Sequence, residues 1–123
     1  MKITLEEALN NLESSRLVFK RAQDRYSSAV DRVQRAQYGY DDAWKTYVRY
    51  GRRELAEAFH QKSQELDYAV MEYNKAKSYL KISGVKLRKA DRTVKKLQKK
   101  AENEKRKEEK RKEKEEAAMF WFN

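Results

Sequence analysis

Large and small residues follow a seven-residue repeat through the first 50 positions of the chain. If the heptad positions are lettered a to g, large apolar residues fill the a positions and small residues fill nearly all the d positions. The a positions are Leu5, Leu12, Phe19, Tyr26, Val33, Tyr40 and Tyr47, and the d positions are Ala8, Ser15, Ala22, Ala29, Ala36, Ala43 and Tyr50. Apolar a and d positions are typical of a helix that packs along another helix. Thr4 followed by Glu7 fits a capping box, so the pattern predicts a helix over about residues 4–49.

A second repeat begins after a break in phase between Tyr50 and Leu55. Its a positions are Phe59, Leu66, Tyr73, Leu80, Leu87, Val94 and Ala101, and its d positions are Leu55, Lys62, Ala69, Ala76, Ser83, Ala90 and Leu97. Gly51 lies in the break, and glycine suits the left-handed residue that ends a helix. The phase continues across Ser83 and Gly84. We therefore expect a single turn, at Gly51, and a second helix over about residues 53–97.

Folding the chain about Gly51 pairs residues whose numbers add to 102. Most large a residues of the first arm then meet small d residues of the second, as in Tyr26 with Ala76. The reverse holds for small residues of the first arm, as in Ala22 with Leu80. Large against small in each layer keeps the packed volume even. The pattern predicts an all-α fold, a long antiparallel coiled-coil helical hairpin.

The chain beyond Leu97 changes character. Residues 101–118 are blocks of charge with opposite charges four residues apart, as in Arg111 and Glu115, which favours a solvated single helix. A disordered tail is the alternative. We expect a hairpin over 1–100, a charged helical extension over 101–118 and a hydrophobic C-terminal docking peptide over 119–123.

Composition supports helices and excludes several classes of protein. Ala, Glu, Lys, Leu and Arg account for 66 of the 123 residues, with no Pro and three Gly, so a β-sandwich or an α/β fold is not expected. The absence of Cys excludes disulfides and thiolate metal ligands. The longest unbroken apolar run is Met119–Phe122, and residues 1–4 lack the apolar stretch of a signal peptide. We expect a cytoplasmic protein that does not interact with a membrane.

Positive charge is concentrated in one stretch of the second helix. Residues 85–100 contain eight basic residues and one acidic residue, a net charge of +7 out of +10 for the chain. Most of the eight fall on the outer b, c and f positions. We call them the basic stripe: Lys86, Arg88, Lys89, Arg92, Lys95, Lys96, Lys99 and Lys100. Such a stripe can contact phosphates of DNA or RNA, or an acidic protein surface, or serve only to keep the face solvated.

The turn gathers aromatic and arginine side chains, which are common anchors of binding hot spots. The candidate hairpin-tip site consists of Trp44, Arg49, Tyr50, Arg52 and Arg53. Trp44 has a structural alternative, in which it only covers the seam beside Phe59.

The chain ends with large apolar residues after 18 that are nearly all charged or small. Met119, Phe120, Trp121 and Phe122 are the candidate partner-docking residues. They could enter a pocket of a partner, fold back on the flank around Leu9, or drive self-association. The four residues resemble the short hydrophobic C-terminal peptides with which some phage replication proteins bind sliding clamps, although the usual acidic residue is missing.

Residues for catalysis or cofactor binding are missing from the pattern. His60, the only histidine, falls on an outer b position, where solvent is its expected neighbour. Asp41 and Asp42 are adjacent and point about 100° apart on a helix, so they are poorly placed to share a proton or a metal. No glycine-rich phosphate loop occurs. We expect no enzymatic activity, no cofactor and no metal.

These observations favour a non-catalytic adaptor or inhibitor that docks on a larger protein or nucleoprotein assembly. Its partner would offer an acidic surface and an apolar pocket. Small basic chains of this kind are common among phage-encoded proteins, so a bacteriophage origin is one expectation. A sequence-independent DNA- or RNA-binding protein that uses the basic stripe is one alternative. A self-associating scaffold is another, because apolar flank residues such as Val30 and Val70 would let two hairpins share a four-helix bundle as a homodimer.

Overall fold

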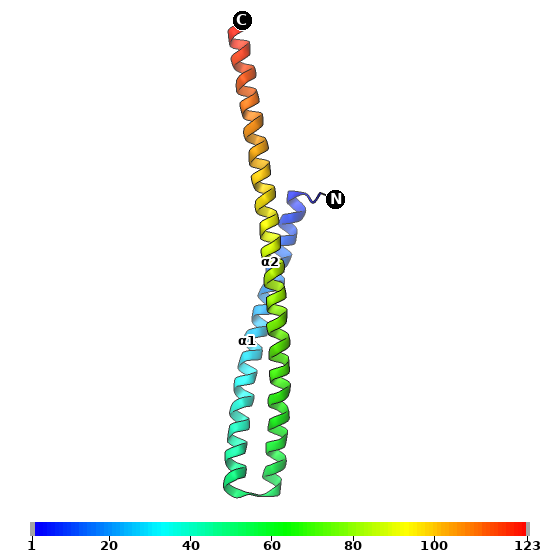
Figure 1. Cartoon of the computed structure of the whole chain (residues 1–123), viewed down its shortest axis with the longest axis vertical. Helices are drawn as coiled ribbons and strands as arrows, with labels where there is room; N and C mark the ends of the chain where they lie inside the picture. Colours follow the sequence, from blue (N-terminus) through cyan, green and yellow to red (C-terminus); the bar gives the residue numbers. More distant parts are fainter. Residues whose placement is uncertain (1, 123) are drawn as a thin grey trace. The chain divides into compact units, whose positions relative to one another are not determined.

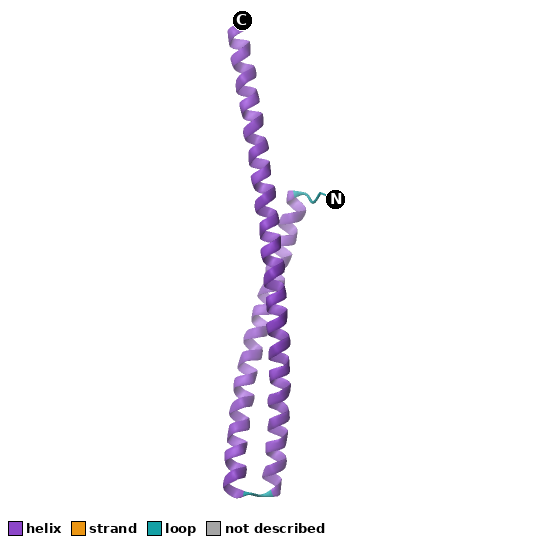
Figure 2. Ribbon diagram, in the orientation of Figure 1, coloured by secondary structure: helices purple, strands orange, loops and turns teal. Residues whose placement is uncertain are grey.

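A computed structural model describes residues 2–122, with Phe122 described by its backbone alone. The described residues form two helices, α1 (Leu5–Tyr50) and α2 (Arg53–Phe122), and no strand (Figures 1 and 2). The helices contact each other and are joined by a two-residue turn. The predicted all-α helical hairpin is confirmed at this level.

The start of α1 is fixed by the predicted cap. The backbone N–H of Glu7 donates to the Thr4 hydroxyl at 3.1 Å, and the N–H of Ala8 donates to the Thr4 carbonyl at 2.9 Å. A threonine hydroxyl in this position satisfies one of the amides that a helix leaves unpaired at its start. Glu6 and Glu7 place negative charge in the first turn, where the helix dipole favours it.

The turn lies where the break in the repeat predicted it. Gly51 has a φ of 59°, and its N–H donates to the Tyr47 carbonyl at 2.8 Å. Left-handed backbone is costly for residues with a Cβ, so glycine is the favoured residue here. The Arg52 carbonyl then accepts from the N–H groups of Leu55 and Ala56 and starts α2.

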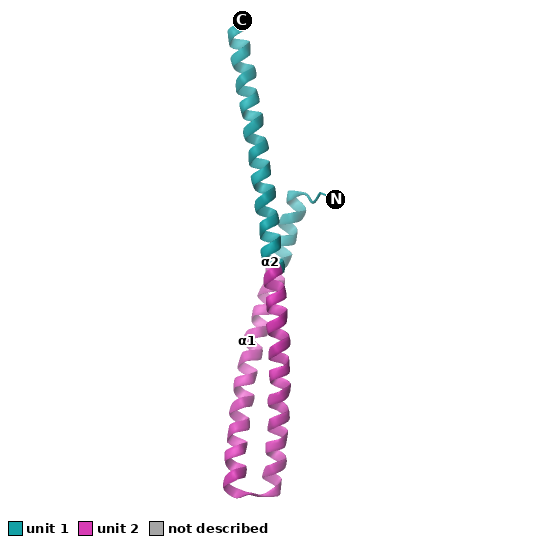
Figure 3. Cartoon of the chain, in the orientation of Figure 1, with its two compact units in different colours: residues 1–15, 86–123 teal, residues 16–85 magenta. Residues whose placement is uncertain are grey.

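The chain divides into two compact units (Figure 3). Unit 1 consists of Met1–Ser15 and Lys86–Asn123, and unit 2 consists of Arg16–Val85. Each unit therefore contains part of both helices. A single continuous hairpin over residues 1–100 stays a prediction.

The core of unit 1 is a small aliphatic cluster. Ala8, Leu12 and Val94 are buried, and they pack with the half-buried residues Leu87, Ala90 and Leu97 of α2. Burying a leucine or valine side chain contributes about 1.5–3 kcal/mol. The cluster therefore attaches the first three turns of α1 to the α2 segment that carries the basic stripe.

The core of unit 2 is narrower. Its buried residues are all small: Ala22, Ala29, Ala69, Ala76 and Ser83. Large side chains lie beside them half-buried, and the Tyr26 and Tyr73 rings meet with centroids 5.5 Å apart and hydroxyls 3.1 Å apart. Small residues let the two backbones approach, while the aromatic rings cover the seam.

Over the residues whose burial the structure describes, all eight buried ones fall on predicted a or d positions. Lys62 is an exception to the predicted core, because it is a d residue whose side chain is 46% exposed and pairs with Glu65 at 3.3 Å. The layer pairing about a sum of 102 stays a prediction. The tyrosine pair above adds to 99, as does the ring contact of Tyr40 with Phe59 at 4.9 Å.

Beyond Leu97, every residue of α2 up to Trp121 is exposed, including the predicted a residue Ala101. The helix continues to Phe122, past the predicted end near 118, because Ala117 and Ala118 are strong helix formers and no Gly or Pro interrupts them. Arg111 and Glu115 approach at 3.9 Å, one of the i,i+4 pairs expected in this extension.

Candidate interaction surfaces

The basic stripe lies entirely in unit 1, and all eight of its side chains are exposed. The neighbouring a and d residues Leu87, Ala90, Val94 and Leu97 pack toward α1, so the stripe lies on the outward side of α2. Lys95 forms a 2.9 Å ion pair with Asp91, the one acidic residue in the stretch. With eight basic residues against one acidic residue, the stretch keeps a net charge of +7.

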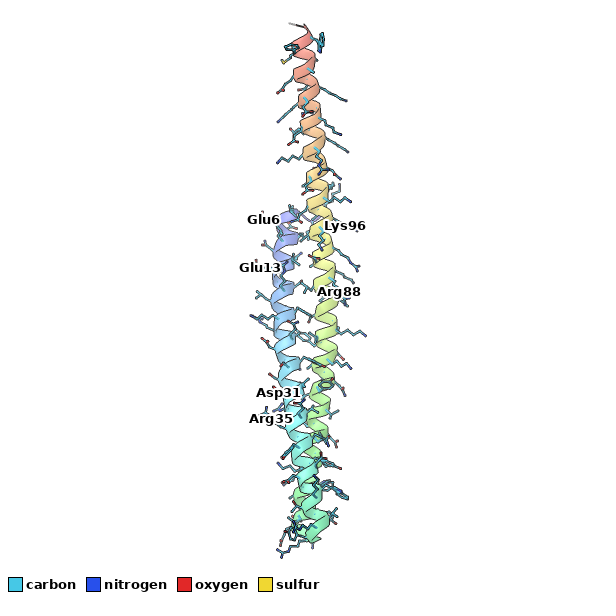
Figure 4. The ribbon with its side chains drawn as sticks, turned by 90° about the vertical axis from the view of Figure 1, so that its left-hand side faces the viewer. Glu6, Glu13, Asp31, Arg35, Arg88 and Lys96 are labelled. Atoms are coloured by element: carbon cyan, nitrogen blue, oxygen red, sulfur yellow. The ribbon has the colours of Figure 1, made fainter. Side chains whose placement is uncertain are left out.

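The N-terminal segment of unit 1, residues 2–15, has the opposite net charge. Glu6, Glu7 and Glu13 are all exposed there, against one basic residue, Lys2. Figure 4 labels Glu6 and Glu13 on α1 and Arg88 and Lys96 on α2. Unit 1 thus has an acidic helical segment packed beside a basic one. A charged partner is therefore attracted to one side of the unit and repelled from the other.

The last turn of α2 exposes three large apolar side chains. Met119, Phe120 and Trp121 are 69%, 80% and 82% exposed, and the Phe120 and Trp121 rings contact each other edge to face at 6.3 Å. Met119, Phe120 and Trp121, the side chains of this peptide that the structure describes, are uncovered and do not fold back on the flank. The predicted docking role of the Phe122 side chain and of Asn123 falls outside the described residues.

The hairpin-tip residues of unit 2 divide into packed and exposed groups. Trp44 lies 5.2 Å from the Phe59 ring, and Tyr47 stacks on the same ring at 6.2 Å, so Trp44 does cover the seam. It is nevertheless 49% exposed. The Arg49 guanidinium lies 5.4 Å from the centre of the Tyr50 ring, at the end of α1.

The two remaining tip residues, Arg52 and Arg53, are exposed at the turn and the first residue of α2. The helix dipole disfavours cations at a helix start, and Glu54 offsets part of that cost. The tip is therefore a small aromatic cluster edged by three arginines.

An arginine-lined groove in unit 2 was missed by the sequence analysis. One hollow of about 390 Å³ is lined by Arg25, Ser28, Ala29, Arg32, Arg35, Glu72 and Ala76. A second, of about 560 Å³, shares Arg32 and Arg35 and adds Ala36, Lys62, Glu65, Tyr68 and Ala69. We call the two together the arginine groove. Its signal in the sequence was six basic residues against two acidic ones over 16–35, which averaging over 1–50 concealed.

A polar tyrosine pair lies in the same unit. The hydrogen bond with the Tyr73 hydroxyl, followed by partial burial and by the charge of that neighbouring phenol, raises the pKa of Tyr26 above its ordinary value of 10.0. The pair contributes a specific contact between the helices.

In the part of the chain that the structure describes, no cluster of side chains that could hold a metal ion is formed. Within residues 2–122, no group of three or more His, Asp or Glu side chains is placed to hold a metal ion. His60 is exposed, and its Nε2 atom lies 3.4 Å from Gln64 Nε2. Over the same residues, neither helix contains a stretch that is both long and apolar enough to cross a bilayer.

Comparisons with known proteins found no relative of this chain. The sequence matches no protein-family model and no curated protein, and no solved structure matches its fold. The surfaces described above are therefore the basis for assigning a function.

Proposed function

We propose that this protein is a non-catalytic adaptor or inhibitor that docks on a larger assembly through unit 1. The observation that carries the proposal is the exposure of Met119, Phe120 and Trp121 on the last turn of a solvated helix. Exposed aromatic side chains in contact with each other are a preferred anchor for a pocket on a partner. The helix presents them about 30 Å beyond Leu97.

The basic stripe supplies the second part of the proposed interaction. It lies on the same helix as the aromatic turn, so one acidic partner surface can meet the stripe while its pocket takes the aromatic residues. Complementary charge accelerates such association and orients the partner. The partner we propose has an acidic face next to an apolar pocket, and we place the interaction in the cytoplasm, with a phage-encoded origin as the sequence suggests.

The helices serve as a stiff support in this proposal. We propose that they pack as an antiparallel coiled coil within each unit, which is supported by the burial of a and d residues such as Ala8 and Val94 in unit 1 and Ala22 and Ala76 in unit 2.

Recovery of partners from a host lysate, with and without nuclease, tests the proposal. The full chain is compared with the double variant Phe120→Ala/Trp121→Ala and with the control Leu17→Ala, which removes an exposed apolar side chain from unit 2. We expect a nuclease-resistant protein partner whose recovery falls at least tenfold with the double variant and is unchanged with the control. Unchanged recovery with the double variant would contradict the proposal.

A second function is favoured by the exposure of the whole basic stripe. If the protein instead binds DNA or RNA without sequence preference through the stripe, recovery of its partners should collapse with nuclease and not depend on Phe120 and Trp121. Reversing the charges of Lys89, Arg92 and Lys96 to Glu should then abolish binding. If the double variant instead changes only the oligomeric state in sedimentation, the scaffold alternative is supported.

A further inference from the structure

We propose that the arginine groove of unit 2 is a binding site for single-stranded nucleic acid, separate from the surfaces of unit 1. Arg25, Ser28, Arg32 and Arg35 follow one another at intervals of three or four residues, so they share one face of α1. At 1.5 Å per residue this face extends about 15 Å.

The charge of the groove is only partly compensated from α2. Glu72 lies 3.9 Å from Arg25 and 3.6 Å from Lys75, and Glu65 pairs with Lys62 at 3.3 Å. Arg32 and Arg35 have no ion pair with any described carboxylate. Like charges three residues apart on one helix face disfavour each other, and an anion bound between Arg32 and Arg35 would offset that cost.

Arginine side chains indicate the chemistry of the anion. The planar guanidinium offers five N–H donors in a fixed fork that matches two oxygens of one phosphate. The Ser28 hydroxyl adds a neutral donor to the same hollow. The groove floor consists of Ala29, Ala36, Ala69 and Ala76, which leave room for a backbone to approach the seam between the helices.

Two exposed tyrosines, one in the lining of the groove and one beside Arg25, distinguish a nucleic acid from other polyanions. Tyr68 lines the hollow that contains Arg35 and is 54% exposed, and Tyr79 lies 5.8 Å from the Arg25 guanidinium and is 40% exposed. The two are eleven residues apart on α2, or about 16 Å. Exposed aromatic rings beside a basic groove are the platforms on which unstacked bases pack. Only a single strand offers its base faces in this way, which favours it over a duplex.

Fluorescence anisotropy of a labelled dT20 oligonucleotide tests the site on the full chain. The variant Arg32→Gln/Arg35→Gln should weaken binding at least tenfold and reduce the slope of log K against log salt by about 1.4, because each phosphate contact on a single strand contributes about 0.7. The control Lys99→Gln/Lys100→Gln removes the same charge from the basic stripe and should change affinity less than threefold. Circular dichroism melting of each variant verifies that it is folded.

The tyrosines and competitors complete the test. Tyr68→Ala should weaken dT20 binding about tenfold, while Tyr68→Phe, which keeps the ring, should bind like the wild type. Unlabelled dT20 should displace the label at a far lower concentration than a duplex or polyglutamate of equal charge. The proposal is overturned if the wild type does not bind dT20, if the Lys99/Lys100 control loses as much affinity as the arginine variant, or if polyglutamate competes equally. It is also overturned if Tyr68→Ala has no effect. None of these results bears on the aromatic turn of unit 1, so the proposed function is tested separately.

Discussion

The two units carry the same net charge but display it in different ways. Unit 1 and unit 2 each have a net charge of +5. In unit 1 the cations are mostly lysines spread over the exposed surface of a single helix, whereas in unit 2 three arginines line a groove between two helices. Lysine on an open face acts as a mobile point charge, and arginine held in a groove can form directed paired hydrogen bonds. Equal charge therefore supports different kinds of recognition, depending on whether one helix or two form the surface.

The largest expected loss of stability comes from a substitution in the core of unit 1, which should affect unit 1 and leave unit 2 folded. Leu12→Ala deletes the largest buried side chain of unit 1 and should lower the free energy of unfolding by about 3 kcal/mol. Hydrogen exchange should accelerate over residues 86–97 and change little over the unit 2 residues. The control Leu17→Ala, at an exposed position, should cost less than about 0.5 kcal/mol. Equal acceleration in both units would show that they unfold as one.

The turn of unit 2 gives the next largest effect. Gly51→Ala forces an alanine into left-handed backbone and should destabilise the protein by about 1–2 kcal/mol. Gly39→Ala is the matched control, since Gly39 is helical and a Cβ there would meet Lys62 at an ordinary 3.6 Å. That change should stabilise the helix by up to about 1 kcal/mol. Urea unfolding of both variants measures the difference, and two changes of the same sign would refute the assignment of the turn.

A smaller, pH-dependent effect is expected at the tyrosine pair of unit 2. Because the pKa of Tyr26 is raised in the folded protein, its contribution to stability is complete below pH 10 and is lost as the pH rises through the folded pKa. The melting temperature should therefore fall more steeply above pH 10 in the wild type than in Tyr26→Phe. Parallel melting curves for the two proteins would exclude a role for this hydrogen bond.

The smallest effect is expected in the solvated extension of unit 1. Glu115→Gln removes the partner of Arg111 and should destabilise the helix by no more than about 0.5 kcal/mol. The helix content should therefore fall only slightly. Circular dichroism at low and high salt measures this. A larger loss would mean that the ion pair, and not the intrinsic propensity of residues 101–118, holds the extension helical.

Much of the fold followed from the heptad pattern, because burial between two helices is a property of periodic spacing. The pattern placed Ala22 and Val94 in the core and Gly51 at the turn, where the structure has them. Lys62 broke the pattern, since a long side chain at a d position can still extend its ammonium group to solvent.

Of the candidate surfaces, the sequence predicted the basic stripe but not the arginine groove. The exposure of the basic stripe followed from outer heptad positions on one helix. The arginine groove could not be predicted in this way. Tyr68 and Glu72 of α2 complete the hollows that Arg32 lines, and their position depends on how the two helices pack. Sites between helices depend on register, and the charge of one helix does not encode that register.

The arginine groove of unit 2 and the aromatic turn of unit 1 are proposed to bind different ligands. Mapping which residues respond to single-stranded DNA tests this most directly. Backbone amide NMR spectra of the full chain can be recorded as dT20 is added. We expect shifts concentrated over residues 25–35 and 68–79, with the amides of Met119, Phe120 and Trp121 unmoved. Shifts concentrated over residues 86–100, with those of 25–35 unchanged, would contradict this expectation and assign nucleic-acid binding to the basic stripe.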